Sequence, residues 1–548
     1  MADLAFLWHM HQPDYRHPES GEFVLPWVLL HAIKDYADMA GHLERHPQIR
    51  CTVNFVPVLL DQIEDYVDQF TRGDWRDPLL AIVARGTADA AQRAWLLDLA
   101  FRGHAPTLIE PFAPYRRLRD IRDALDNHGD VGHTYLGDHY FSDLACWMLL
   151  AWSGETLRRE NTVITRLMAQ GEGFDASARQ TLLAELGSII AGIIPRYRAL
   201  SERGQIELSC TPAHHPLAPL LLDFASAREA WPTCPLPAAP GYPGGKSRIA
   251  AHLAEALASH ARRFGTPPAG LWPAEGALSQ ALLALIGDAG LRWTASSAAV
   301  LSHSAGPEAS PYHPWQAPDS RLTLFFRDEH LSDLIGFEYA RWHGRDAAQH
   351  FLTALAKIAD DTPDALIPVF LDGENAWEYY PYNAWYFFDD LYTALAAHPK
   401  IRTVTLAEAA IRHAPRCRQL PRLVAGSWVY GNFSTWIGHP DKNHAWELLC
   451  EAKHSVDRLL TSPHLDEAEY RAIVQRLAVC ESSDWFWWLG EDNPPEAIAR
   501  FDQLFRANLA TLYRLLELPV PGRLAMPLSH GGDGTAESGG TMRRAGSA

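Results

Sequence analysis

Two carboxylates in this chain stand where they could perform acid–base and nucleophilic chemistry. Glu275 lies in the segment GLWPAEGALS and Asp372 in the segment PVFLDGENAWEYYP, and each follows an apolar run and has tryptophan nearby. A carboxyl group in such surroundings can have a shifted pKa, and a sugar ring can stack on tryptophan. Retaining cleavage of a glycosidic bond needs two such groups, one to attack the anomeric carbon and one to shuttle the proton.

A histidine pair near the N-terminus is a second candidate group. His9 and His11 stand two positions apart in HMHQP, at the end of a predicted strand. The period of a strand places both side chains on one face. They could donate hydrogen bonds to sugar hydroxyls, bind a divalent metal, or pack in a satisfied core.

Two later loops carry further candidates. His215 follows the predicted strand 205–210 and is expected where a substrate would lie. Asp328 follows another predicted strand, and it either contacts substrate or joins Arg327 and Asp333 in an ion-pair network that fixes the loops.

Tryptophans are concentrated in WVYGNFSTWIG and SDWFWWLG. Neighbouring rings on a helix or strand point in different directions, so some of them should be exposed and free to stack on sugar. Trp436 and Trp485 are the candidates for such contacts, and packing between domains is the alternative.

Alternating strands and helices must position these groups. Short apolar runs with strand character recur between helical patterns, which predicts parallel strands joined by crossover helices. Seven or eight such units indicate a (β/α) barrel, in which chemistry sits at the carboxyl ends of the strands. Glu275 and Asp372 both fall at such ends. The predicted strands are 4–9, 50–56, 205–210, 270–272, 291–296, 322–327, 366–372 and 401–406.

The domain organisation follows from the same pattern. Residues 1–415 are predicted to form the catalytic barrel, with a helical insertion at about 57–203. Residues 416–525 are predicted to form a C-terminal helical domain that contributes to the cleft. The Gly/Ser-rich residues 526–548 are expected to be a disordered tail.

Composition narrows the classes of function. A net charge of −18 argues against nucleic acid or an anionic membrane as a partner, whereas a neutral polysaccharide is compatible with it. Seven cysteines without a CxxC pair predict buried free thiols in a reducing compartment, and no signal peptide or membrane span is visible, so a cytoplasmic location is expected. The signatures HExxH, GxSxG and GxGxxG are absent.

Six segments in order resemble the characteristic regions of glycoside hydrolase family 57. Four of them are HMHQP, GQIELSCTPAHHPLAPLL, GLWPAEGALS and FLDGENAWEYYP, and GNFSTWIGHPDKNHAWELL and SDWFWWLGED look like the amylopullulanase and α-amylase branch. The resemblance implies an incomplete (β/α)7 TIM-like barrel, and retaining cleavage of α-glucans such as starch, glycogen or maltooligosaccharides. The bonds would be α-1,4 and also α-1,6 in some relatives.

The resemblance also implies roles for individual residues. Glu275 matches the family's nucleophile and Asp372 its general acid/base, with Glu374 as the competing acid. His11 and His215 match positions that line the cleft, and Trp272 and Trp377, beside the two carboxylates, are expected there too. The two carboxyl groups should lie about 5–5.5 Å apart, and the pKa of Asp372 should be raised. This chemistry needs no metal and no other cofactor.

Three other functions stay open at this point. The same carboxylates serve a 4-α-glucanotransferase or branching enzyme, which passes the sugar to an acceptor. A metal-dependent enzyme of the α-mannosidase or deacetylase kind would use His9 and His11. A non-catalytic glucan-binding protein would use only the tryptophans. The sequence indicates no oligomeric state.

Overall fold

A mostly parallel sheet forms the centre of the computed structural model, which describes residues 1–126, 132–460 and 465–532. Its strand order is β10-β6-β7-β5-β4-β3-β2-β1-β8, and β9 also pairs with β1. All eight predicted strands are present: β1 (Ala2–Met10), β2 (Cys51–Phe55), β3 (Ile206–Cys210), β4 (Gly270–Leu271), β5 (Trp293–Ser297), β7 (Thr323–Arg327), β8 (Leu366–Asp372) and β9 (Ile401–Thr403). Two short strands were not predicted, namely β6 (Trp315–Gln316) and β10 (Arg418–Gln419).

Strand β1 organises the sheet. All nine of its residues are buried, and it pairs in parallel with β2, β8 and β9. The register sets His9 beside Asn54 on β2 and beside Asp372 on β8. Strands β7 and β8 also approach each other: the backbone N–H of Asp328, directly after β7, donates to the carbonyl of Pro368 on β8 at 2.7 Å. The carboxyl ends of the strands therefore converge on one region.

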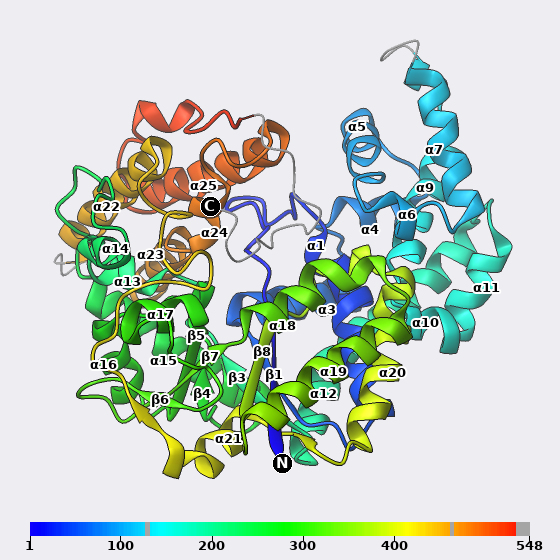
Figure 1. The fold of residues 1–548 in the computed structure, drawn as a ribbon. Helices are drawn as coiled ribbons and strands as arrows, with labels where there is room; N and C mark the ends of the chain where they lie inside the picture. The colour runs from blue at the N-terminus through cyan, green and yellow to red at the C-terminus, as the bar shows by residue number, and fades with distance from the viewer. Residues whose placement is uncertain (127–131, 461–464, 533–548) are drawn as a thin grey trace.

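Helices cover the outside of the sheet (Figure 1). Helix α15 (Gly245–Phe264) shows why they form: it begins after Gly244 and ends at Gly265, both with left-handed backbone angles, and Ile249, Leu253 and Ala256 bury one stripe. The other covering helices include α16 (Gln280–Asp288), α17 (Ala298–Ala305), α19 (Gly344–Asp361), α20 (Trp385–Ala396) and α21 (Leu406–Arg412).

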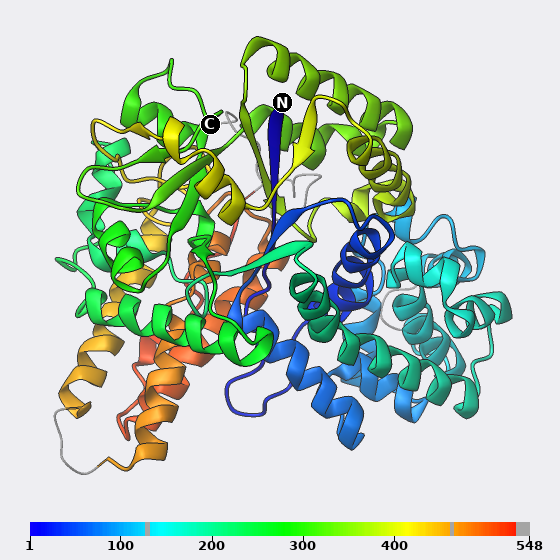
Figure 2. The ribbon, with the colours of Figure 1, turned by 90° about the horizontal axis from the view of Figure 1, so that it is seen from below.

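The described residues of the predicted insertion are helical and contain no strand. They form α3 (Pro57–Arg72), α4 (Pro78–Arg85), α5 (Ala90–Leu99), α6 (Ala105–Leu108), α7 (Ala113–Asp126), α9 (Asp138–Trp152), α10 (Glu155–Glu160), α11 (Thr162–Gln170) and α12 (Ala176–Glu202). Figures 1 and 2 show this region, coloured blue to cyan, on a different side of β1 from the orange and red C-terminal helices.

The C-terminal helices are α22 (Pro440–Leu460), α23 (Glu467–Cys480), α24 (Ser483–Trp488) and α25 (Pro495–Leu515). Part of the predicted disordered tail is ordered: Leu528 N–H donates to Asp502, and Ser529 Oγ accepts from the N–H of Gly490. The remainder of that predicted tail, 533–548, lies outside the described residues. In the described part of the chain no helix is long and apolar enough to cross a membrane.

A buried ionic cluster joins the C-terminal helices to α15. Glu481 is fully buried and accepts hydrogen bonds from Arg248, His252 and Tyr242 at 2.5–2.7 Å. Burial alone would raise the pKa of Glu481, but the hydrogen bond with His252 and the charge of Arg248 outweigh it and lower the pKa to about 2.

Glu481→Gln is therefore expected to destabilise the protein by about 3–5 kcal/mol, because it leaves the buried Arg248 without its counter-charge. The carboxylate's contribution is fully present above its unfolded pKa of about 4.3 and is lost as the pH falls through about 2. Urea unfolding at pH 7 measures the loss. The exposed control Glu467→Gln should change stability by less than about 0.5 kcal/mol, and an equally small change in Glu481→Gln would contradict the prediction.

Candidate active site

One cavity lies where the carboxyl ends of β1 and β8 meet the C-terminal helices. Strand ends supply Asp372 and the histidines, the turn after β4 supplies Glu275, and α24 supplies Asp484. Its wall is formed by His9, His11, Gln12, Pro13, Tyr15, His215, Glu275, Arg327, Asp333, Phe337, Leu371, Asp372, Glu374, Asn375, Trp428, Val429, Asp484, Trp487 and Trp488.

Glu275 is held in a strained turn directly after β4. Its φ of 59° is in the left-handed region, which costs energy for a residue other than glycine and is common at functional sites. The residue is 8 % exposed, and its carboxylate oxygens lie 3.1 Å from Ser483 Oγ and 3.4 Å from Trp428 Nε1. The backbone N–H of Trp428 also donates to the backbone carbonyl of Glu275 at 3.0 Å. Trp428 and Ser483, which lie far along the chain, therefore fix the orientation of this carboxyl group.

Asp372 ends β8 and faces the same cavity. One of its oxygens accepts a hydrogen bond from Asn375 Nδ2 at 2.8 Å. Glu374 is more deeply buried: one oxygen accepts from the N–H of His11 at 3.0 Å, and the other has no partner among the described residues. Burial, with the charge of Asp372, raises the pKa of Glu374 well above its usual range. Glu374 ties β1 to the loop after β8 through its hydrogen bond with His11, and Asp372 is the less deeply buried of the two carboxyl groups.

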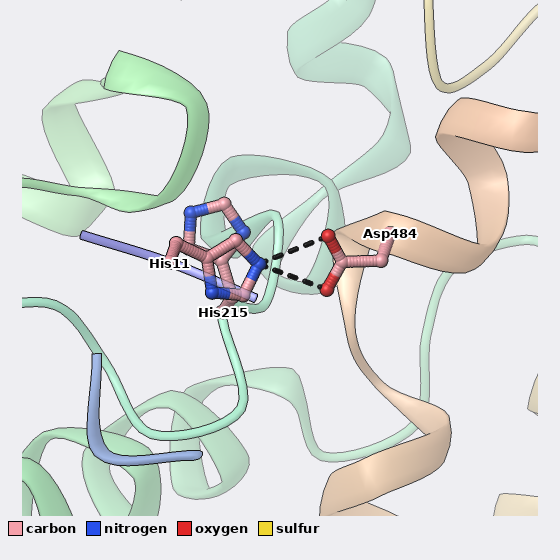
Figure 3. Close-up of side chains that lie close together, drawn as sticks. All are labelled: His11, His215 and Asp484. Atoms are coloured by element: carbon pink, nitrogen blue, oxygen red, sulfur yellow. Dashed lines mark hydrogen bonds and ion pairs between the residues drawn. The ribbon is translucent and has the colours of Figure 1, made fainter. Parts of the chain in front are cut away.

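The histidines connect the two sides of the cavity. The rings of His11 and His215 stack at 3.7 Å between centroids, and His11 Nε2 lies 2.9 Å and 3.1 Å from the oxygens of Asp484 (Figure 3). Burial, with the charges of neighbouring histidines, lowers the pKa of His215 well below its usual range and that of His9 to about 3. Both rings are therefore neutral at pH 7.

A hydrogen-bonded chain runs from Glu275 through Ser483, His215 and His9 to Asn54. The separations along it are 3.1, 3.0, 3.3 and 2.7 Å. Asn54 Oδ1 can only accept, so His9 donates from Nδ1 and accepts at Nε2 from His215. The Ser483 hydroxyl lies 3.0 Å from His215 Nδ1 and donates to a carboxylate oxygen of Glu275 at 3.1 Å. This hydrogen bond stabilises the carboxylate form of Glu275 and so opposes the rise in its pKa that burial causes.

Three side chains place possible metal ligands close together. One ligand atom from each of His11, His215 and Asp484 lies within 4.8 Å of the others. The two rings are nearly parallel, at 19°, so their in-plane lone pairs run side by side instead of meeting at one ion. The geometry fits a hydrogen-bonded His11–Asp484 pair better than a chelate.

The model of glycosyl hydrolase family 57 matches residues 5–421, which include both carboxylates. The chain belongs to glycosyl hydrolase family 57. Its members are enzymes, and the resemblance inferred from the six segments is confirmed.

Solved structures share the fold of this family 57 chain at low sequence identity. A branching enzyme of Pyrococcus horikoshii is 16 % identical with a TM-score of 0.61, covering 94 % of this chain and 89 % of its own. An α-amylase of Thermotoga maritima is 14 % identical with a TM-score of 0.55, covering 94 % and 93 %. A 4-α-glucanotransferase of Thermococcus litoralis is 14 % identical with a TM-score of 0.52, covering 94 % and 60 %.

Several residues predicted to contact substrate lie elsewhere. Trp377 packs between Trp8 and Phe388 in the core, with Nε1 donating to the carbonyl of Gly373. Trp436 and Trp485 are at most 1 % exposed. These rings stabilise packing and are not on the cavity wall, so the expectation of sugar contacts is corrected for all three.

Trp272 and Asp328 also need correction. Trp272 is fully buried, and its ring packs against that of Trp428 with the centroids 5.0 Å apart. Asp328 accepts from the N–H of Leu331 at the start of α18 (Glu329–Asp333) and from the hydroxyl of Tyr312, so it fixes a loop. Of the predicted residues, the structure brings together on the cavity wall His9, His11, His215, Glu275, Asp372 and Glu374.

Other groups at the cavity were not predicted. Ser483 and Asp484 contact Glu275 and His11, and Trp428, Trp487 and Trp488 form much of the aromatic wall. Their segments were noted for tryptophan content, and SDWFWWLGED also for the family resemblance, but no role was predicted for these residues. The signal that could have found the polar pair is the serine and aspartate directly before the aromatic run in SDWFWWLG.

The two principal carboxyl groups both have raised pKa values. Burial, then the charges of Asp484 and Asp372, raise the pKa of Glu275 to about 8. Burial raises the pKa of Asp372 to about 6, although the Asn375 hydrogen bond and the charge of His11 oppose it. The raised pKa predicted for Asp372 is confirmed. In the free cavity Glu275 holds its proton more tightly than Asp372.

Proposed function

We propose that this family 57 enzyme is a retaining hydrolase of α-1,4-glucosidic bonds in α-glucans, with Glu275 as nucleophile and Asp372 as general acid/base. The observation that carries the proposal is that both carboxyl groups line one buried cavity with an aromatic wall. The α-glucan activities in the names of structural neighbours support the substrate class. We further infer that strands β7-β5-β4-β3-β2-β1-β8 form an incomplete (β/α)7 barrel, open between β7 and β8, in a cytoplasmic protein.

The reaction follows from the positions of the two groups. Protonated Asp372 donates its proton to the glycosidic oxygen while ionised Glu275 attacks the anomeric carbon, and the leaving sugar departs with the proton. Asp372, now ionised, takes a proton from water, and the resulting hydroxide attacks the β-linked glycosyl-enzyme. The product keeps the α configuration, and both carboxyl groups return to their starting states.

Substrate must redistribute the proton that the pair shares. Since the pKa of Glu275 lies above that of Asp372, a single shared proton resides mainly on Glu275 in the free cavity. A bound glycosidic oxygen accepts a hydrogen bond from protonated Asp372 and so favours that form. Sugar binding thereby brings the site into its reactive proton arrangement.

The pH profile of kcat/KM should be bell-shaped, with limbs near pH 6 and pH 8. Below about 6 both carboxyl groups are protonated and Glu275 cannot attack, and above about 8 neither holds a proton for the leaving group. Initial rates on maltoheptaose from pH 4 to 10 measure the profile. Full activity at pH 4 or at pH 10 would contradict this account of the pair.

Glucan transfer is the second candidate. Trp428, Trp487 and Trp488 line the cavity and could hold a sugar acceptor in place of water. A branching enzyme and a 4-α-glucanotransferase are among the structural neighbours.

A product profile separates the candidates. Purified protein is incubated with maltoheptaose and, separately, with pullulan, and the products are resolved by chromatography beside the Glu275→Gln variant. Hydrolysis predicts only shorter products, and products longer than maltoheptaose would show that transfer dominates. Full turnover of maltoheptaose in the presence of EDTA is expected, and loss of turnover would favour a metal-dependent reaction. No turnover of either glucan would overturn the proposal.

A further inference from the structure

Aromatic rings gather on the surface at the start of α20, outside the catalytic cavity. Tyr382 is 55 % and Tyr386 41 % exposed, and their ring centroids are 5.4 Å apart at 84°. Figure 1 shows the start of α20 beside α10 of the helical insertion. We call Tyr382 and Tyr386 the aromatic platform.

The loop that carries the platform is strained and firmly anchored. Tyr382, Asn383 and Ala384 are three consecutive residues other than glycine with left-handed φ values of 56°, 50° and 60°. Asn383 fixes them, because it accepts from buried Lys34 at 3.2 Å and donates to buried Asp38 at 2.9 Å. Such backbone conformations cost free energy, and this strain typically occurs at functional sites.

The guanidinium of Arg159, beside the platform, already has hydrogen-bonding partners. Arg159 donates to the hydroxyl of Tyr386 at 3.1 Å and to Glu155 at 2.7 Å, and its guanidinium lies 4.2 Å from the ring centre of Trp385. These contacts hold Tyr386 in place without leaving an unpaired charge there. The guanidinium also lies 5.2 Å from the ring centre of Tyr386, so the exposed ring of Tyr382, at 84° to it, offers the more open aromatic face for a neutral, hydroxylated ligand.

The platform also lies within reach of the reaction centre. Asn375 in the cavity and Tyr382 are seven residues apart on one loop, which spans at most about 25 Å. This separation is short enough for one polysaccharide chain to span.

We propose that the aromatic platform is a second glucan-binding site that holds a distant part of an α-glucan polymer. The inference rests on the proposed α-glucan function. The platform would bind the polymer, and the cavity would cleave the glycosidic bond.

The test compares polymer binding with turnover of a short substrate. Tyr382→Ala/Tyr386→Ala is expected to weaken retention in amylopectin-containing native gels about tenfold, since each lost stacking contact contributes about 0.5–1.5 kcal/mol. Its kcat/KM on maltotriose should stay within about twofold of the parent. Retention is measured in the Glu275→Gln background, which leaves the polymer intact. Tyr382→Phe/Tyr386→Phe should keep retention, and so should Tyr470→Ala, which removes an equally exposed ring (46 %) on α23.

Two failures are distinguishable. If the parent cleaves maltotriose and is retained by amylopectin, but the double alanine variant is retained equally, the platform proposal is overturned and the proposed function stands. If the parent neither cleaves maltotriose nor is retained, both proposals fail. Equal losses on maltotriose and on amylopectin would also overturn the platform, because they would show damage to the cavity. The single variant Tyr382→Ala removes the ring without disturbing Arg159 and should show part of the loss.

Discussion

Replacement of Glu275 by glutamine should lower kcat at least about 10³-fold, equivalent to about 4 kcal/mol of transition-state stabilisation. Glutamine has the same shape and keeps a hydrogen-bonding oxygen near Ser483 and Trp428. It cannot form the glycosyl ester, so chemistry is lost while the fold and substrate binding remain. Steady-state rates on maltoheptaose and thermal unfolding of the same preparation measure both effects.

Two comparisons make this result specific. Glu255→Gln changes a half-exposed glutamate on α15 and should retain full activity. Glu275→Ala opens space beside the anomeric carbon, and added azide should restore turnover and give the β-glycosyl azide. Wild-type rates in Glu275→Gln would remove Glu275 from the mechanism, and an α-azide would show that the attack comes from the other face.

Asp372→Asn is expected to lower kcat/KM on maltoheptaose by about 10²–10⁴-fold, the usual contribution of general acid–base catalysis. The loss should depend on the leaving group. An aryl α-maltoside with an acidic phenol departs without a proton, so its first step should be nearly normal and the glycosyl-enzyme should accumulate as a burst of phenol. The comparison of the two substrates under identical conditions is the measurement.

Glu374→Gln is the matched control for this acid. Because buried Glu374 has a strongly raised pKa, an amide resembles its protonated state and can still accept the N–H of His11. We expect it to change kcat less than about tenfold. The reverse order, with Glu374→Gln far more damaging than Asp372→Asn and dependent on the leaving group, would assign the acid role to Glu374.

The sequence revealed the groups that follow strands and missed those that depend on distant packing. Glu275 and Asp372 could be predicted because each follows a short apolar run, and parallel strands bring such positions to one end of a sheet. Ser483 contacts Glu275 across 208 residues, and no local pattern encodes that approach. The mostly parallel sheet was predicted for the same reason, since all eight apolar runs became strands.

Tryptophan was the least reliable predictor of a sugar contact. Trp485 and Trp488 are three residues apart on α24, yet the first is buried against Phe505 and the second reaches the cavity wall. The orientation of a short helix against α25 decides this, and the sequence of the helix does not contain it. The order of pKa values is also a tertiary property, because the charge of Asp484 comes from the C-terminal helices.

Trapping of the covalent intermediate tests the central claim most directly. The protein is incubated with 5-fluoro-α-glucosyl fluoride, which forms a glycosyl-enzyme readily and releases it slowly, and the digested protein is mapped by mass spectrometry. The account predicts one added glycosyl group on Glu275, and none in Glu275→Gln. A label on a different carboxylate, or an unlabelled enzyme that turns over the reagent with inversion, would contradict it.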